Sequence, residues 1–383
     1  MNLSDYMVLA SALTSLILMI IASVRVRKRA SVTKEVATKV TTKPVTTTVS
    51  RPTTKEGIKP KPTEEVKPQV TKVVTIEELL GKELKGLITG YAADVTKVFR
   101  AYLPKVILPK GFSSEWLCIK LGCGGWGCAY KCEDRSGTKA VFKVPKGLEG
   151  IIEEGELPTI PEELISKVCS RAEAVLNLRH PHILKLLGYS RRVPLLIYEF
   201  ANYGSLEWQL SRGWVPSLSD ALLITIQLAD ALRYIHSRGL IHGDIKAGNI
   251  FIVDGVVKLG DFSSIVKLLS QTSAHSRFSA TPGWRAPEQV YSDLRRKAIE
   301  RGLEDRIDSY QIGNLMLYLL TGNTLDGEDA VNDRIVSTYV STLPSRLRGI
   351  VRRLLSVNPW ERPSMDELVR SLLILYNEFS FTQ

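Results

Sequence analysis

The chain has 383 residues, of which 44% are hydrophobic and 24% charged, a balance typical of a folded globular protein. Its formal net charge of +11 would suit a nucleic-acid-binding protein, but the basic excess is local. Residues 25–75 contain 13 Lys or Arg and 4 Glu, a surplus of 9. Since residues 1–24 carry one negative charge, residues 76–383 keep a net charge of only +3. We therefore expect no nucleic-acid partner.

An apolar stretch lies near the N-terminus. Residues 6–24 (YMVLASALTSLILMIIASV) are 19 residues without a charge, enough for a helix to cross a hydrocarbon core of roughly 30 Å. Basic residues follow this stretch and none precedes it. This asymmetry predicts that residues 1–24 form an uncleaved single-pass anchor in the cell membrane, with the rest of the chain in the cytoplasm. A hydrophobic helix buried in a soluble domain is the alternative.

The next segment, residues 25–75, is rich in Thr, Lys, Val and Pro and has no aromatic residue. Such a composition cannot bury enough apolar surface to offset the loss of chain entropy. We predict a disordered basic linker, and its cationic residues would be drawn to anionic lipid head groups.

Beyond the linker the hydrophobic pattern changes. Apolar and aromatic residues between positions 76 and 102 recur at helical spacing, so we predict a helical extension over residues 76–111. Short β-like runs begin at residue 112, and a mostly helical series begins near residue 220. This order favours a β-rich part followed by a helical part.

Four of the five cysteines, Cys118, Cys123, Cys128 and Cys132, fall within one short stretch. Their spacing lacks the paired C-x2-C pattern of a zinc site. They are interpreted as small apolar residues of a β-hairpin, with a disulfide or a redox-sensitive thiol as alternatives. Because the chain is expected in the cytoplasm and the cysteine count is odd, we predict no disulfide framework.

A glycine-rich segment, LGCGGWGCAYK, starts at Leu121 and places Gly122, Gly124 and Gly127 in the pattern G-x-G-x-x-G. Dinucleotide-binding folds share this pattern, but there a helix follows, whereas here a second strand is expected. The segment is therefore interpreted as a hairpin whose backbone N–H groups face nucleotide phosphates. Twelve residues after the segment, Lys143 lies inside an apolar strand, where it needs a negative partner.

A second group of polar residues follows in LIHGDIKAGNIFI and GDFSS. Phosphoryl transfer requires a metal ion, a group that orients the attacking hydroxyl, and a cation near the transferred phosphoryl. Asn249 and Asp261 offer the oxygen ligands that magnesium prefers, Asp244 is the candidate base, and Lys246 is the candidate cation.

With these motifs in this order, residues 112–380 resemble the eukaryotic-type Ser/Thr protein kinase family. The resemblance implies an α+β bilobal fold, with the N-lobe at residues 112–201 and the C-lobe at residues 202–383. It also implies ATP and Mg²⁺ (or Mn²⁺) as cofactors and proteins as substrates. The ATP-binding residues that it implies are Leu121, Gly122, Gly124, Gly127, Ala129, Val141, Lys143, Glu199 and Ala201.

The resemblance extends to residues around the catalytic loop. Tyr198 matches the gatekeeper position, and Thr281 matches the substrate-loop threonine of Ser/Thr kinases. Asp308 resembles the helix aspartate that braces the catalytic loop, and Arg362 resembles the ion-pair partner of Glu288. A small-molecule kinase also uses the sequence H-G-D, but Lys246, Thr281 and Glu288 favour a protein substrate. A catalytically dead scaffold is the other alternative.

Three positions depart from the family pattern. Gly243 replaces the arginine that precedes the catalytic aspartate, so we expect little dependence on activation-loop phosphorylation. Ser263 replaces the last glycine of D-F-G. The third departure concerns the glutamate that pairs with the strand lysine, because family spacing leads to Arg171. We favour Glu173 as the partner of Lys143, with Glu163 or no acid as alternatives.

Overall fold

The computed structural model describes residues 72–74, 98–103, 108–155, 158–267 and 281–380. The predicted anchor at residues 6–24 and most of the predicted linker and extension lie outside these residues. In the part that is described, we find no helix that is both long and apolar enough to span a bilayer.

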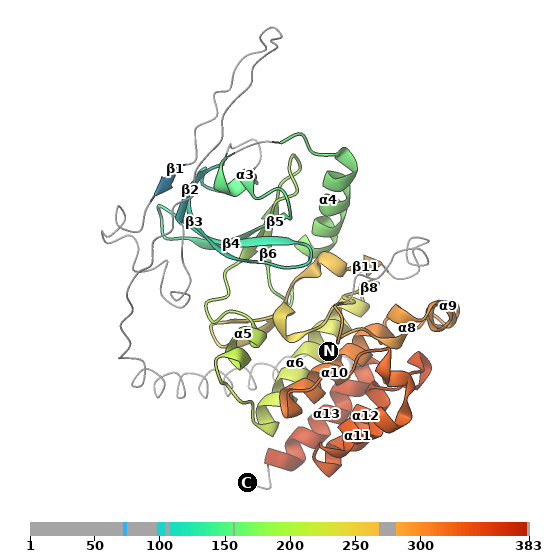
Figure 1. Cartoon of the computed structure of the whole chain (residues 1–383). Helices are drawn as coiled ribbons and strands as arrows, with labels where there is room; N and C mark the ends of the chain where they lie inside the picture. Colours follow the sequence, from blue (N-terminus) through green and yellow to red (C-terminus); the bar gives the residue numbers. More distant parts are fainter. Residues whose placement is uncertain (1–71, 75–97, 104–107, 156–157, 268–280, 381–383) are drawn as a thin grey trace, which may run out of the picture.

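An antiparallel sheet forms the first lobe, with α4 beside it (Figure 1). Its strands are hydrogen-bonded in the order β1-β2-β3-β4-β5-β7-β6. Their bounds are β1 (Lys72–Val74), β2 (Val98–Tyr102), β3 (Glu115–Cys123), β4 (Gly127–Asp134), β5 (Lys139–Pro145), β6 (Leu186–Tyr189) and β7 (Leu196–Glu199). Two helices accompany the sheet, α3 (Gly150–Glu153) and α4 (Glu162–Leu176).

The first two strands correct the sequence prediction. Residues 98–102 form a strand and not the end of a helix, and residues 72–74 of the predicted linker pair with it. Phe99, Ala101 and Leu103 are buried at every second position, the period of a strand with one face in the core. The sheet therefore begins before residue 112.

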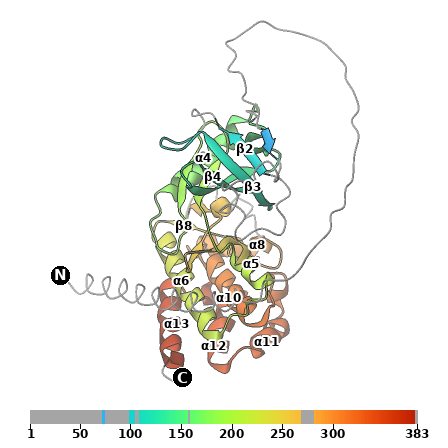
Figure 2. The same cartoon turned by 90° about the vertical axis from the view of Figure 1, so that its left-hand side faces the viewer.

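The second lobe is helical (Figure 2). Its longest helix, α6, starts with a capping box in which Ser217 and Asp220 satisfy each other's backbone N–H groups. The α-helices of this lobe are α5 (Leu206–Ser211), α6 (Leu218–His236), α8 (Pro287–Val290), α9 (Ser292–Glu300), α10 (Arg306–Thr321), α11 (Asp333–Ser341), α12 (Ser345–Leu354) and α13 (Met365–Ser380). Its short 3-10 helices are η2 (Ala247–Asn249), η3 (Phe262–Ser264), η4 (Asp329–Val331) and η5 (Pro359–Glu361).

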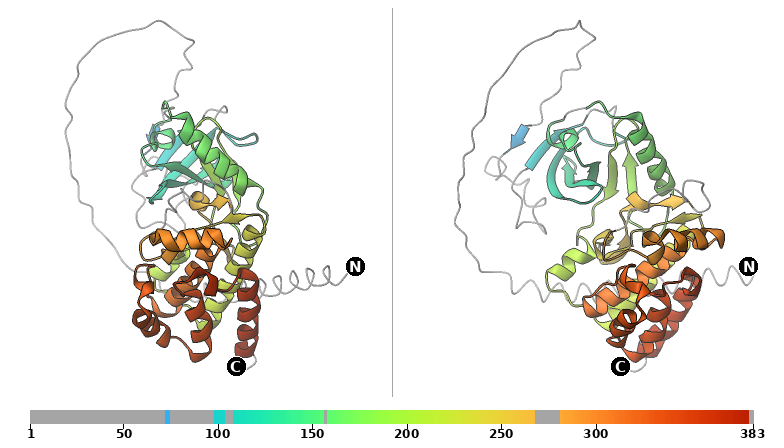
Figure 3. Two further views of the ribbon diagram at one scale, coloured as in Figure 1. Left: turned by 90° about the vertical axis from the view of Figure 1, so that its right-hand side faces the viewer. Right: turned by 45° about the vertical axis from the view of Figure 1, so that its right-hand side comes forward.

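Two small antiparallel sheets carry the segments next to the catalytic loop (Figure 3). They pair β9 (Ile250–Val253) with β10 (Val256–Leu259), and β8 (Leu240–Ile241) with β11 (Val266–Lys267). The main core fills the helical lobe and extends to the buried face of α4, while a separate core lies within the large sheet. The predicted bilobal α+β fold is confirmed.

Candidate active site

Asp244 lies at the centre of a buried hydrogen-bond network between β8 and η2. Its carboxylate oxygen Oδ2 accepts from Lys246 Nζ and from Asn249 Nδ2, each at 3.0 Å. The other oxygen, Oδ1, accepts from the hydroxyl of Thr281 at 3.0 Å, and Lys246 also donates to that hydroxyl. The structure thus brings the predicted base, cation and substrate-loop threonine together, with Asp244 only 7% exposed.

A side chain of α10 holds the backbone of this loop. Asp308 is fully buried and accepts from the N–H groups of His242 (3.0 Å) and Gly243 (2.8 Å). His236 Nε2 lies 2.7 Å from the same carboxylate. Burial would raise the pKa of Asp308, but the hydrogen bonds and charges of its neighbours hold it below its ordinary value. The bracing role expected of Asp308 is confirmed.

Two buried glutamines that the sequence prediction missed complete this support. Gln311 Oε1 accepts from Ile245 N at 2.8 Å, and its Nε2 donates to the carbonyl of Gly243 at 3.1 Å. Gln289 Nε2 donates to the same carbonyl at 2.9 Å. Gly243 has φ +76°, a conformation that an arginine would adopt only under strain. Glycine therefore fits the backbone of this loop.

Lys143 makes its ion pair with Asp261, and the two charged atoms are 2.6 Å apart. Lys143 and Val141 lie on the face of β5 opposite Phe142, because side chains alternate along a strand. Burial would raise the pKa of Asp261, but Lys143 and the Ser263 hydroxyl bring it below its ordinary value, so the carboxylate is ionised. This charged carboxylate lies beside the lysine that is expected to meet the ATP phosphates.

Asn249 and Asp261, the predicted metal ligands, are brought together by the β9–β10 hairpin. Gly260 N donates to the carbonyl of Asn249 at 2.8 Å, so the two segments lie side by side. The Asn249 amide nitrogen is directed to Asp244, which leaves its amide oxygen as the atom that a cation could use. The two residues therefore fit the donor set that magnesium prefers.

The glycine-rich segment forms the turn between β3 and β4, as predicted. Gly124 N donates to Gly127 O at 2.8 Å. At Gly127 a Cβ atom would lie 2.0 Å from the carbonyl oxygen of Val144, so only glycine permits this close approach of β4 to β5. Ala129 is the register partner of Lys143 and is half-buried like Leu121. These positions match the predicted hairpin that faces the nucleotide phosphates.

The residues expected to contact adenine, Glu199 and Ala201, lie at and just after the end of β7. Tyr198, the predicted gatekeeper, is buried and pairs with Val141 across the sheet. The Glu199 side chain accepts from Lys258 Nζ and from Lys185 N, each at 2.7 Å. Its side chain is therefore engaged on the protein, and adenine contacts through the backbone of Glu199 and Ala201 stay a prediction.

The helix α4 corrects the prediction for the partner of Lys143. Glu173 points away from the cleft, accepts from the Tyr189 hydroxyl at 2.8 Å and lies 3.4 Å from Arg191, with 56% of its side chain exposed. Glu163 is also exposed. The residue that faces inward is Arg171. The preference for Glu173 was therefore wrong, and the family spacing correctly identified position 171 as the one that faces the active site.

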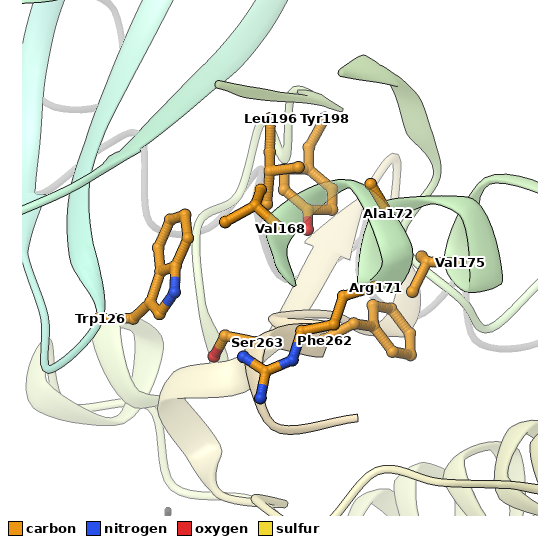
Figure 4. Close-up of a pocket in the computed structure, with 9 residues that line it drawn as sticks. All are labelled: Trp126, Val168, Arg171, Ala172, Val175, Leu196, Tyr198, Phe262 and Ser263. Carbon is orange, nitrogen blue, oxygen red and sulfur yellow. The ribbon is translucent and has the colours of Figure 1, made fainter. Parts of the chain in front are cut away.

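Figure 4 shows the pocket into which Arg171 extends. Its side chain runs from α4 toward Ser263, and Trp126 of the glycine-rich turn lies across the pocket. The pocket is small and opens to solvent. The other lining residues are apolar or aromatic and come from α4, β7 and η3: Val168, Ala172, Val175, Leu196, Tyr198 and Phe262.

The hairpin cysteines contradict the prediction of no disulfide framework. Cys118 is bonded to Cys132, and Cys123 is bonded to Cys128, while Cys169 is free. The reason is the strand register, which makes each bonded pair direct partners across β3 and β4 with Cα atoms 4.1 and 4.0 Å apart. Both disulfides lie in the hairpin that carries the glycine-rich turn.

The predicted ion pair between Glu288 and Arg362 is confirmed. Arg362 donates to both carboxylate oxygens of Glu288, at 2.6 and 2.8 Å, and both side chains are almost fully buried. Arg362 also donates to backbone carbonyls, which satisfies the remaining polar atoms of a buried pair. The pair connects α8 to the segment before α13.

Comparisons with known proteins agree with this geometry. A family model described as protein kinase domain matches residues 118–374. A probable serine/threonine-protein kinase of Dictyostelium discoideum is 30% identical over 258 residues, 63% of this chain and 50% of the relative. An Aurora kinase of the same organism is 32% identical over 203 residues, 50% of each protein. An Aurora kinase of Schizosaccharomyces pombe is 29% identical over 275 residues, 69% of this chain and 72% of the relative. The chain thus spans about half the length of the first two relatives.

Proposed function

This chain belongs to the protein kinase domain family, and from that premise we propose that it transfers the γ-phosphoryl of ATP to serine or threonine hydroxyls of proteins. The observation that supports this most strongly is the hydrogen bond from the Thr281 hydroxyl to Asp244, with Lys246 on both groups. A hydroxyl, a carboxylate and an ammonium group are in contact there, which supports a site that orients a hydroxyl for phosphoryl transfer.

The steps follow from these side chains. Asp244 accepts a hydrogen bond from the attacking hydroxyl and takes up its proton as the hydroxyl oxygen bonds to the γ-phosphorus and the bond from that phosphorus to the bridging oxygen breaks, which releases ADP. Lys246 lies against the same carboxylate and stabilises the negative charge of the transferred phosphoryl group. Asp308 and the two buried glutamines keep the loop backbone in place, so little reorganisation is needed during transfer.

ATP and its metal ion fit the remaining residues. Asn249 and Asp261 would hold Mg²⁺, with Mn²⁺ as the alternative, and the glycine-rich turn and Lys143 would hold the phosphates. The metal ion, when bound, would neutralise the negative charge of the phosphates. The contribution of the protein is to keep Asp261 ionised and to hold Lys143 beside it.

The membrane anchor is part of the same proposal and is supported by the sequence. The apolar run at residues 6–24 and the basic residues after it favour a single-pass protein with a cytoplasmic kinase domain. In that location the two hairpin disulfides would have to persist against cytoplasmic thiols, which makes the side of the membrane the part of the proposal that most needs the test below. Protease added to intact cells should leave residues 30–383 uncut, and carbonate washing should leave the protein with the membranes. Recovery in the soluble fraction would refute the anchor.

The Thr-rich linker is a candidate site of autophosphorylation, which mass spectrometry after incubation with ATP would detect.

The transfer reaction can be tested with the full chain in detergent, labelled ATP, Mg²⁺ and a library of peptides that contain Ser, Thr or Tyr. We expect phosphoserine and phosphothreonine, and loss of the signal in the Lys143→Ala variant. A parallel assay with small hydroxyl compounds in place of the peptides tests the alternative: label found only there would favour the small-molecule kinase, and no transfer by the wild-type chain in either assay would favour the inactive scaffold.

A further inference from the structure

Arg171 is a cation on the inner face of α4, where the family spacing leads one to expect a carboxylate. Residues three and four apart on a helix share a face, and Val168 and Val175 on either side of Arg171 are buried. Arg171 itself is half-buried and extends into the pocket toward Ser263 (Figure 4). Its guanidinium therefore faces the active site and not the outer surface of the helix.

The described residues give this guanidinium neither an ion pair nor a hydrogen bond. Burial lowers the pKa of Arg171, but an arginine keeps its charge at neutral pH. A partly buried cation without a partner is costly, and a bound anion would remove that cost. Glu173, two residues further along the helix, is engaged on the outer face with Tyr189 and Arg191 and offers no compensation.

The pocket of Arg171 adjoins the groups that were assigned to the nucleotide. Trp126 lines this pocket, and its ring centroid lies 5.2 Å from Lys143 Nζ. Ser263 lies two residues after Asp261, whose carboxylate pairs with Lys143. Among the residues that the structure describes, Lys143 has a negative partner in Asp261, whereas Arg171 has none, so its positive charge is available to an anion beneath the glycine-rich turn.

We propose that Arg171 is a ligand for the phosphate groups of the bound nucleotide, a role that rests on the proposed use of ATP. A guanidinium presents its N–H donors in a planar fork that matches two phosphate oxygens. In this arrangement Asp261 holds Lys143, and α4 contributes a cation in place of a carboxylate. The helix thus contacts the substrate directly and does not act through the lysine.

The test compares how the full chain in detergent binds Mg-ATP and adenosine, measured by calorimetry. In Arg171→Gln the affinity for ATP should fall by roughly 10- to 100-fold, the range for a lost charged hydrogen bond, while the affinity for adenosine stays the same. Arg171→Lys should lose less, and Arg171→Glu should lose more. Lys167→Gln removes a charge from the exposed face of α4 and should bind both ligands like the wild type.

An unchanged ATP affinity in Arg171→Gln would overturn the inference, as would an equal loss for ATP and adenosine. Tighter ATP binding in Arg171→Glu would also overturn it, because position 171 would then act as the carboxylate partner of Lys143. A wild-type chain that binds adenosine and ATP equally would refute the role of Arg171 as a phosphate ligand but not the proposed function. A wild-type chain that binds neither would refute the proposed function and this inference together.

Discussion

The two sides of the active site are held in different ways. On the helical side, the loop around Asp244 is fixed by buried polar side chains, chiefly Asp308, Gln311 and Gln289. On the sheet side, two disulfides hold the glycine-rich hairpin, and a single ion pair orients Lys143. Loss of one member of a buried polar network leaves its partners unsatisfied and costs stability. The glycine-rich hairpin is partly exposed and depends less on such partners. Several hydrogen bonds thus hold the Asp244 loop, and two covalent bonds hold the glycine-rich hairpin.

Removal of the central acid should break the helical side. In Asp308→Ala the N–H groups of His242 and Gly243 lose their acceptor, and His236 loses its partner. We expect the free energy of unfolding to fall by about 3–5 kcal/mol and the transfer rate to fall with it. Chemical denaturation measures the first effect. Asp293→Ala, which removes a surface acid beside Arg296, should change stability by less than about 1 kcal/mol. Equal losses in the two variants would contradict this account of the loop.

The Asp308 carboxylate makes the free energy of unfolding depend on pH. The pKa of Asp308 is below its ordinary value in the folded chain, so the stability that it contributes is complete above its pKa in the unfolded chain, about 4. It is lost as the pH falls through the lowered pKa of the folded state. The unfolding free energy of the wild type should therefore decline in acid more steeply than that of Asp308→Ala. Parallel curves would show that Asp308 is not the titrating support.

Loss of a disulfide should weaken the sheet side. The bond between Cys118 and Cys132 closes a loop of about 15 residues, for which chain-entropy estimates give about 3 kcal/mol. We expect the double variant Cys118→Ala, Cys132→Ala to lose roughly 2–3 kcal/mol under non-reducing conditions. Cys169→Ala is the matched control, since Cys169 is free. Titration of the unfolded, unreduced wild type should find one thiol, and five thiols would refute both bonds.

A change at Glu173 should have the smallest effect. Its exposed contact with Arg191 and its distance from the ion pair of Lys143 predict that Glu173→Gln changes stability by less than about 1 kcal/mol. The transfer rate should stay within about twofold of the wild type. A large loss of rate would restore Glu173 to the active site and separate it from the surface residues.

Sequence reasoning could propose roles for most of the candidate site because the chemistry needs specific side chains in a fixed order. Asp244, Lys246, Asn249 and Asp261 could each be assigned a role from their motifs, and the structure brings the first three into one network. The buried glutamines could not be predicted, because a polar residue within a helix gives no sign of which loop it will contact.

Other errors have geometric causes. Phe99 fits a helical spacing but is also part of a strand alternation with Ala101 and Leu103, and only sheet pairing decides between them. The disulfides follow from the hairpin register, which could have been derived from the position of the turn. Glu173 was favoured for nearness in sequence, although two residues along a helix differ by about 200° and face opposite sides.

The most direct test of the central claim is the single-turnover rate of phosphoryl transfer by the full chain and by Asp244→Asn, with ATP affinity measured on the same samples. Asparagine preserves the shape of the side chain but cannot accept the proton, so the rate should fall by roughly 10²- to 10⁴-fold. The affinity for ATP should stay within a few-fold of the wild type, because Asp244 binds the hydroxyl side of the reaction. Equal transfer rates in the two proteins would contradict the assignment of Asp244 as the base.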